Sequence, residues 1–269
     1  MKIGFIGYGD AASGLCRGLV TEEGADIVIY GRDHKKTSDR AAELGNSEKY
    51  AVVKELRELL DVCEVVCVTV PCSADDEVFS QIVSLGVRKG AIYADMCSAT
   101  PEQKKKNAKA VEDAGGRFAD VSIMDAVRKI LHKTPLLASG SAAEDFRKIM
   151  TSYNMDVSTA GDEPGRAALV KLCRSIFLKG IIALAIETED VSRNLGVYDE
   201  VFDSIAVSWD TNKFMDYMPK QIRGMKEHCV RMKAETEECL ETAKSAGIPG
   251  YMTEGTISLL GSLTEDKMI

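Results

Sequence analysis

The chain has 269 residues, of which 45% are hydrophobic and 28% charged, and its formal net charge at pH 7 is −8. This acidic balance argues against a general nucleic-acid or membrane surface as a partner, because both attract an excess of basic side chains. No stretch approaches the roughly 20 apolar residues of a membrane span, and the first residues resemble a folded strand rather than a signal peptide, so we expect a cytoplasmic protein.

The chain begins with an apolar strand at residues 2–6, which runs directly into a Gly-x-Gly-x-x-Ala turn and then a helix. Gly7 permits the tight turn, Gly9 leaves room for a pyrophosphate against bare backbone, and the small Ala12 lets the helix pack close to its strand. A second strand at residues 26–30 completes the unit. The arrangement predicts a dinucleotide-binding site with the pyrophosphate at the helix N-terminus.

The end of the second strand favours one dinucleotide over another. An arginine at this place accommodates a 2′-phosphate, whereas a carboxylate binds the ribose 2′-hydroxyl. Arg32, with Lys35 and Lys36 nearby, therefore favours NADP. Asp33 keeps NAD open as the less favoured cofactor, and solvated loop charges are a third interpretation. The predicted cofactor contacts are Gly7, Tyr8, Gly9, Asp10, Ala11, Ala12, Gly31, Arg32, Thr69 and Pro71.

Short β-branched runs alternate with helical stretches up to about residue 160. This pattern is typical of a parallel sheet covered on both faces, so we predict an α/β fold with a doubly wound, mostly parallel Rossmann sheet in a domain of residues 1–162. The expected strands are 2–6, 26–30, 65–70, 91–95, 117–122, 136–139 and 155–159. The expected helices between them include 11–22, 37–44, 53–59, 75–83 and 101–114.

The alternation stops after the Asp162-Glu163-Pro164-Gly165 turn, and a helical pattern runs from about 166 to 194. Its middle, residues 177–186, is apolar almost all round, which indicates burial on several sides. A further long helix is expected at about 219–246. We therefore predict an all-α second domain of residues 163–269 and a homodimer that packs through it.

The eight cysteines are scattered and form none of the Cys-x-x-Cys pairs of a zinc or redox site. Most are expected to be buried, reduced thiols, since free cysteine behaves as a small hydrophobe. No metal site is predicted.

The segment Asp95-Met96-Cys97-Ser98-Ala99-Thr100-Pro101 follows an apolar strand and precedes a helix. Its small hydroxyl-bearing turn offers donors at a helix N-terminus, which suits an anionic substrate. An equally concrete interpretation is structural, with Thr100 as the N-cap and Pro101 at the first helical position. The residues alone leave these two interpretations equal.

Lys171 lies about one and a half turns into an otherwise apolar helix. Burial lowers the pKa of a lysine toward neutrality, and such a lysine can act as general acid and base at a carbonyl oxygen. Ser175 lies one turn further on the same face and Arg174 is adjacent, so a proton donor, a hydroxyl and an anion clamp could converge. The alternative is a lysine whose stem packs on apolar surface while its amine stays in water.

The glycine turn, the Asp-x-Cys-Ser-x-x-Pro segment and the Gly-x-x-x-x-x-Lys segment occur in an order and spacing that resemble β-hydroxyacid dehydrogenases, the group that includes 6-phosphogluconate dehydrogenase. The resemblance covers about residues 1–195. It implies that Ser98 contacts the substrate carboxylate, that Cys97 lines the same pocket, and that Lys171 is the acid and base during hydride transfer.

The chain also departs from that family's pattern. Where the family has Pro-Val-Ser-Gly-Gly, this chain has Ser122-Ile123-Met124-Asp125-Ala126, and the two asparagines that follow the lysine in the family are here Arg174 and Ser175. The substrate pocket therefore differs, and a standard hydroxyisobutyrate or tartronate substrate is in doubt. The predicted substrate contacts are Cys97, Ser98, Ser122, Arg174 and Ser175.

The C-terminal part resembles a small subgroup of these oxidoreductases that carries its own helical domain. His228, Arg231 and Glu235 share one face of the expected helix, where they form either a solvated salt-bridged face or a substrate ligand set that reaches a neighbouring subunit. Glu187 falls 16 residues after Lys171, about 160° around the same helix and 24 Å along it. We therefore interpret Glu187 as structural or interfacial.

These observations predict an NADP-dependent oxidoreductase that interconverts a hydroxyl and a carbonyl on a small carboxylate-bearing substrate, with Lys171 as general acid and base. Two alternatives stay open. One is an imine reductase, which shares the architecture but commonly has another proton donor in place of the lysine. The other is a non-catalytic NADP(H) sensor whose remodelled residues 124–126 no longer admit a substrate.

Overall fold

The structure is a computed structural model that describes residues 1–265. The chain divides into two compact units, Met1–Arg174 and Ser175–Ile269, which we call the N-terminal and C-terminal units. The boundary falls inside a 30-residue helix, α8 (Arg166–Leu195). The domain boundary after residue 162 stays a prediction.

The N-terminal unit is built on one eight-stranded sheet with the order β3-β2-β1-β4-β5-β6-β7-β8. Neighbouring strands are parallel except for β6 and β7, which run antiparallel. The strands are β1 (Lys2–Ile6), β2 (Asp26–Tyr30), β3 (Tyr50–Val53), β4 (Val65–Val68), β5 (Ile92–Asp95), β6 (Arg117–Ile123), β7 (Leu136–Ser139) and β8 (Val157–Thr159). The predicted α/β class with a mostly parallel sheet is confirmed.

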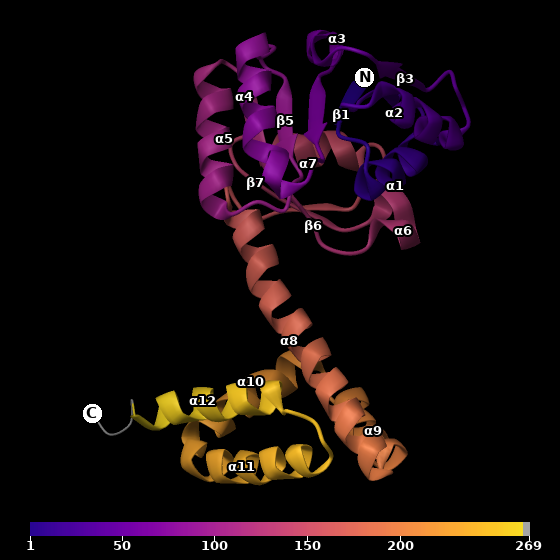
Figure 1. Cartoon of the computed structure of the whole chain (residues 1–269). Helices are drawn as coiled ribbons and strands as arrows, with labels where there is room; N and C mark the ends of the chain where they lie inside the picture. The colour runs from indigo at the N-terminus through magenta and orange to yellow at the C-terminus, as the bar shows by residue number, and fades with distance from the viewer. Residues whose placement is uncertain (266–269) are drawn as a thin grey trace. The chain divides into compact units, whose positions relative to one another are not determined.

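Helices cover both faces of this sheet (Figure 1). Side chains alternate along each strand, so Ile3 and Phe5 of β1 join one buried cluster while Ile6 joins the other. The first cluster includes residues of α1 (Asp10–Leu19), α2 (His34–Ala41) and α7 (Ala143–Thr151). The second includes residues of α3 (Leu56–Val62), α4 (Asp75–Leu85) and α5 (Pro101–Asp113). The doubly wound arrangement directs the carboxyl ends of the parallel strands to one edge.

Strand β3 was not predicted, and the helix expected at 53–59 begins later. Tyr50–Val53 is an edge strand of four residues paired only with β2 among the described strands, and no residue in it is buried. The helix start is set by a capping box, in which the side chains of Glu55 and Glu58 each accept from the other's backbone amide. Val53 therefore lies in the strand and α3 begins at Leu56.

The C-terminal unit is helical throughout its described residues, apart from short connections. It contains the second part of α8, followed by α9 (Tyr198–Asp210), α10 (Phe214–Glu227), α11 (Cys229–Ser245) and α12 (Tyr251–Glu265). Helices α11 and α12 lie side by side (Figure 1), and the Cys229 thiol is 3.8 Å from the Leu263 carbonyl oxygen. A helical second half, as predicted, is confirmed.

The single long helix expected at 219–246 is wrong. Two helices occupy this stretch, and His228 separates them with a backbone conformation of φ −115° and ψ 27°. Pro219 lies inside α10, which begins five residues earlier, at Phe214. The break places Met225 on α10 and Cys229 and Met232 on α11.

None of the helices in the described part of the chain combines the length and the apolar character that a bilayer-spanning helix needs.

Candidate functional site

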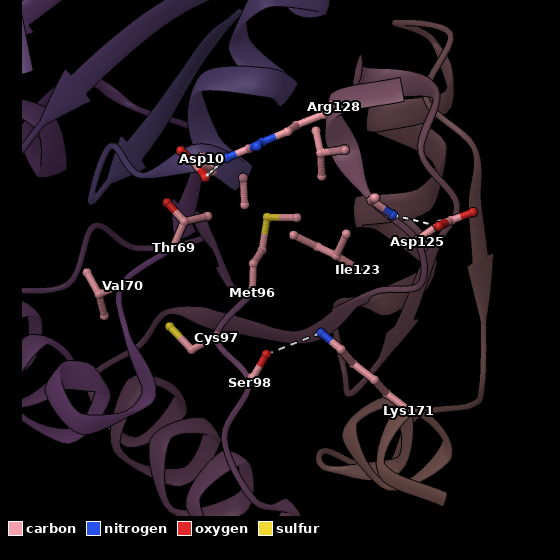
Figure 2. Close-up of a pocket in the computed structure, with 13 residues that line it drawn as sticks. Asp10, Thr69, Val70, Met96, Cys97, Ser98, Ile123, Asp125, Arg128 and Lys171 are labelled. Carbon is pink, nitrogen blue, oxygen red and sulfur yellow. Dashed lines mark hydrogen bonds and ion pairs between the residues drawn. The ribbon is translucent and has the colours of Figure 1, made fainter. Parts of the chain in front are cut away.

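A pocket of about 430 Å³ lies where the carboxyl ends of β1, β4, β5 and β6 meet (Figure 2). An open α/β sheet binds its ligands at this edge, near the point where the strand order reverses. The lining comes from the glycine turn, from Thr69 after β4, from residues 96–98 after β5 and from residues 123–128 after β6. Lys171 of α8 completes it.

Lys171 and Ser98, 73 positions apart in the chain, meet in this pocket (Figure 2). The Lys171 Nζ donates a hydrogen bond of 3.3 Å to the Ser98 Oγ. Lys171 is half-buried, so its amine is neither in open solvent nor enclosed in the core. The pair brings an exchangeable proton and a hydroxyl to one point in the cavity. Proton transfer to a carbonyl oxygen, or from a hydroxyl group, requires this combination.

Hydrogen bonds from the end of β5 and the cap of α5 hold the turn that carries Ser98. Asp95, at the end of β5, accepts a 3.0 Å hydrogen bond from the Cys97 backbone amide. Thr100 accepts from Gln103 N at 3.3 Å and Pro101 occupies the first turn of α5. Thr100 and Pro101 therefore act as the structural cap, and Ser98 is the hydroxyl that faces the pocket. The structural interpretation of this segment applies to Thr100 and Pro101, and a substrate contact by Ser98 stays a prediction.

Cys97 lines the pocket but is a buried thiol. Burial, with the neighbouring carboxylates of Asp95 and Asp75, raises the pKa of Cys97 well above its usual range. The thiol therefore stays protonated at physiological pH and is unsuited to act as a base or nucleophile. Its role at the site is to supply a small apolar wall.

Asp75, Asp95 and Cys97 offer ligand atoms within 4.8 Å of one another. The carboxylates already have cationic and amide partners, since Lys104 Nζ is 2.7 Å from Asp95 Oδ1 and Asn107 Nδ2 donates to Asp75 Oδ2 at 2.8 Å. A metal ion would have to displace this ammonium group. The cluster is therefore better described as an internal charge network than as a metal centre.

The glycine turn fits a dinucleotide. Gly7 has φ +86°, and a Cβ there would lie 3.0 Å from the Thr69 carbonyl oxygen, so the fold itself requires glycine. Gly9 has φ −82°, and a Cβ there would meet no atom within 4 Å. The α1 N-terminus has no side-chain cap. Open space above unsatisfied backbone amides is the environment in which a diphosphate binds.

Asp10, which follows Gly9, is paired with two arginines. Arg40 Nη2 lies 2.6 Å from its Oδ1, and Arg128 from the short helix α6 (Val127–Ile130) reaches across the pocket to its Oδ2 (Figure 2). These hydrogen bonds, with the charges of both arginines, hold the pKa of Asp10 below its usual value. The two guanidinium groups leave this corner of the turn with a net positive charge.

A second groove of about 380 Å³ continues from the other side of the glycine turn. Its lining includes Tyr8, Gly31, Arg32, Lys36 and Pro71. Asp33, at its edge, caps α2 by accepting from the Lys36 backbone amide at 3.0 Å. Asp33 is thus engaged by the fold, while the side chains of Arg32 and Lys36 are exposed.

The lining of the pocket does not include three predicted substrate contacts, Ser122, Arg174 and Ser175. Ser122 is only 3% exposed inside β6, and its neighbour Ile123 lines the cavity instead. Arg174 donates to the Met124 carbonyl oxygen at 2.8 Å, so it fastens the segment after β6. Ser175 belongs to the C-terminal unit. Asp125 and Arg128 line the pocket and were missed, although Asp125 and Ala126, which stand in place of the family's two glycines, already marked this segment as altered.

The C-terminal trio is divided by the helix break. His228 lies between α10 and α11, whereas Arg231 and Glu235 form a 2.7 Å ion pair one turn apart on α11. Both members of that pair are more than half exposed. The structure thus brings Arg231 and Glu235 together as an ordinary solvated pair.

Comparisons with known proteins agree with this geometry. Residues 2–159 match the NAD binding domain of 6-phosphogluconate dehydrogenase. An uncharacterized 28.5 kDa protein of Methanothermus fervidus is 26% identical over 98% of this chain and 100% of its own. The solved structure of the conserved protein MTH1747, described as similar to 3-hydroxyacid dehydrogenases, is 26% identical with a TM-score of 0.66, over 100% of this chain and 98% of that one.

An imine reductase from Myxococcus stipitatus, solved with NADP+, has a TM-score of 0.80 at 16% identity and covers 99% of this chain and 95% of its own. A variant of that reductase was solved with NAD+. At this identity the likeness concerns the fold, which extends through the helical second half.

Proposed function

Because the chain belongs to the family with the NAD binding domain of 6-phosphogluconate dehydrogenase, we propose that this NAD(P)-binding oxidoreductase interconverts a hydroxyl and a carbonyl on a small carboxylate-bearing substrate. The observation that carries the proposal is the Lys171–Ser98 contact of 3.3 Å, in a pocket that also borders the glycine turn.

The residues of the pocket divide the chemistry between them. A bound nicotinamide supplies or accepts the hydride. Lys171 donates a proton to the carbonyl oxygen during reduction and removes the hydroxyl proton during oxidation. Ser98 orients that oxygen through its hydroxyl and, with the backbone amides at the start of α5, attracts the substrate carboxylate. The apolar side chains of Val70, Met96 and Ile123 limit water around the reacting carbon.

We propose NADP as the preferred cofactor. Arg32 and Lys36 are both exposed beside the groove that follows β2, where a 2′-phosphate would lie, and Asp33 is occupied as the α2 cap. Fluorescence titration with NADPH and NADH tests this, with at least about tenfold tighter NADPH binding expected from one or two charged phosphate contacts. Equal affinities would contradict the preference.

Replacing the lysine tests the reaction. Lys171→Ala should lower turnover about 1,000-fold or more while leaving the NADPH Kd within about threefold, because the amine acts on the substrate rather than the dinucleotide. Lys179→Ala removes an exposed lysine eight positions further along α8 and is the matched control. Unchanged turnover in Lys171→Ala would refute the proposed role.

The substrate screen separates the alternatives. Small hydroxyacids, their keto forms and cyclic imines are offered with NADP(H), and absorbance of the reduced cofactor reports turnover. Hydroxyacid or ketoacid turnover that depends on Lys171 supports the proposal. Imine turnover that survives Lys171→Ala would favour an imine reductase, and cofactor binding without any turnover would favour a sensor.

A further inference from the structure

Beneath the Ser98 turn lies a fully buried lysine that the proposed reaction does not use. Lys104, on the inner face of α5, is 0% exposed, and its Nζ lies 2.7 Å from Asp95 Oδ1, 2.8 Å from the Asp95 carbonyl oxygen and 3.5 Å from Asp120 Oδ1. Burial pulls the pKa of Lys104 down, but the two carboxylates hold it above its usual value, so it is an ammonium ion. The ion joins the end of β5 to the middle of the neighbouring strand β6.

Asp95, one of the two carboxylates bound to Lys104, supports the turn that carries Ser98. Asp95 uses the same Oδ1 to accept the 3.0 Å hydrogen bond from the Cys97 amide, and Cys97 is followed directly by Ser98. The orientation of Asp95 therefore determines where the backbone after β5 turns. Lys104 fixes that orientation through two contacts, one to the carboxylate and one to the backbone carbonyl.

Asp120, the second carboxylate near Lys104, supports the start of α8. Asp120 Oδ2 accepts from the Ala168 amide at 3.0 Å and from the Ser139 hydroxyl at 3.1 Å, and Ser139 Oγ accepts from the Ala167 amide at 2.9 Å. These bonds satisfy amides in the first turn of α8 that have no partner within the helix. Lys171 lies one turn further along α8, so the Asp120 contact sets the place from which its side chain extends.

We propose that Lys104 is a positioning residue that holds the Ser98 turn and the first turns of α8 at the separation the Lys171–Ser98 pair requires. The inference rests on the proposed function for what that pair does, but the link itself is a property of the fold. An apolar residue of similar size would fill the interior without the cost of desolvating an ion, and buried ion pairs often add little net stability. Stability alone thus gives a weak reason for a lysine here.

Two neighbouring lysines provide the contrast. Lys105 pairs with Glu163 at 2.7 Å, and Lys106 pairs with Asp76, both on the surface with side chains more than half exposed. They carry the same charge and lie on the same helix, but among the described interactions the carboxylates of their partners accept no hydrogen bond from the Ser98 turn or from an amide of α8. Lys105→Met is therefore a matched control for Lys104→Met.

The experiment compares Lys104→Met, Asp120→Asn and Lys105→Met in the full chain. Asp120→Asn keeps the size of the side chain but lacks one of the two acceptor oxygens and the charge, and it serves if Lys104→Met does not fold. For both test variants we expect kcat to fall about tenfold or more, with the NADPH Kd within about threefold, because the turn and not the dinucleotide site has moved. The double variant should lose little more than the worse single variant, since both break one link.

A second readout does not depend on turnover. The rate at which an amine-reactive reagent modifies Lys171, followed by peptide mass spectrometry across pH, should change at least about threefold in the two test variants and stay unaltered in Lys105→Met. Unchanged kcat and unchanged Lys171 labelling in folded Asp120→Asn or Lys104→Met would overturn the inference. If the wild-type chain turns over no substrate, the proposed function fails and the labelling still decides the positioning role.

Discussion

Neither the backbone conformation nor the packing of the folded chain requires glycine at position 9. Its backbone conformation suits any residue, and a Cβ would meet nothing within 4 Å. Gly9→Ala should therefore change the free energy of unfolding by less than about 1 kcal/mol. The same methyl group would occupy the approach of the diphosphate, so NADPH binding should weaken about 100-fold. Thermal melting and fluorescence titration measure the two effects.

Gly7→Ala provides the opposite case. The positive φ and the nearby Thr69 carbonyl oxygen place the strain in the fold, so this variant should lose stability as well as binding. A Gly9→Ala protein that binds NADPH as tightly as wild type would show that the diphosphate does not cross this turn.

Asp75 makes the stability of the N-terminal unit depend on pH. Burial raises the pKa of Asp75 from 3.8 to about 6; the Asp95 carboxylate adds to the rise, while Lys104, Asn107 and the Cys97 thiol oppose it. A group whose pKa is higher in the folded state contributes stability that is complete below about pH 4 and is lost as the pH rises through 6. The difference between pKa 3.8 and about 6 is worth about 3 kcal/mol at most.

Asp75→Asn removes this dependence. At pH 8 the variant should be more stable than wild type by about 1–2 kcal/mol, because part of the gain is lost to the buried amide N–H. The advantage should shrink as the pH falls below 6 and reverse near pH 4, because the protonated Asp75 then carries no charge penalty while the cost of the buried amide N–H remains. Thermal or denaturant unfolding of both proteins from pH 4 to 8 measures it, and a constant difference across that range would contradict the assignment.

The sequence located some of the residues that line the candidate pocket and groove but not others, and the difference has a physical basis. Gly7, Gly9, Ser98 and Lys171 stand in motifs whose spacing follows from strand, turn and helix geometry, so they could be found without coordinates. Ser122 could not be placed, because a one-residue shift along β6 turns a side chain from the pocket into the core. Asp120 and Lys104 were also missed, since a buried ion pair between distant segments has no local pattern.

At the level of elements, Glu187 holds the N-terminus of α12. Its carboxylate accepts from Met252 N at 2.7 Å, Thr253 N at 3.0 Å and the Thr253 hydroxyl at 2.6 Å. Burial raises the pKa of Glu187, but these hydrogen bonds together lower it below its usual value. The contribution to stability is therefore present above about pH 4.5 and is lost as the pH falls.

Glu187→Ala should destabilise the C-terminal unit by about 1–2 kcal/mol, the usual effect of removing a helix cap. Hydrogen exchange of the α12 amides should quicken, while NADPH affinity stays the same because the cofactor groove belongs to the N-terminal unit. Glu189→Ala, which removes a surface ion pair with Arg193, is the control. Equal exchange rates in both variants would show that Glu187 does not hold α12.

Elements with strong local signals were predicted well, and those decided by packing were not. Strands such as β1, β2 and β4 are apolar runs bounded by turns and could be identified directly. β3 is short and half-exposed, so only its pairing with β2 makes it a strand. The break at His228 has no glycine or proline beside it, and Pro219 lies inside a helix. Glycine and proline were taken as the markers of helix boundaries, so the sequence did not predict where these two helices begin and end.

At the scale of the whole molecule, the C-terminal unit exposes many large apolar side chains and an apolar groove. Ile176, Ile182, Val207 and Met215 are 76%, 60%, 66% and 75% exposed, and a groove of about 660 Å³ with an almost wholly apolar lining runs along α8. Exposed apolar side chains around an apolar groove are typical of an interface. We propose that a second copy of the chain covers it.

Light scattering at micromolar concentration should then give about twice the 29.2 kDa of one chain. Ile182→Glu places a charge on the exposed face of α8 and should shift the protein toward monomer, because burying an unpaired carboxylate costs several kcal/mol. Lys179→Glu, an exposed charged position on the same helix, controls for the added negative charge. NADPH binding should persist in the monomer, since every residue of the glycine turn comes from the N-terminal unit of the same chain. A light-scattering mass of one chain for the wild-type protein at high concentration would contradict the dimer. A different partner would then have to cover the apolar face.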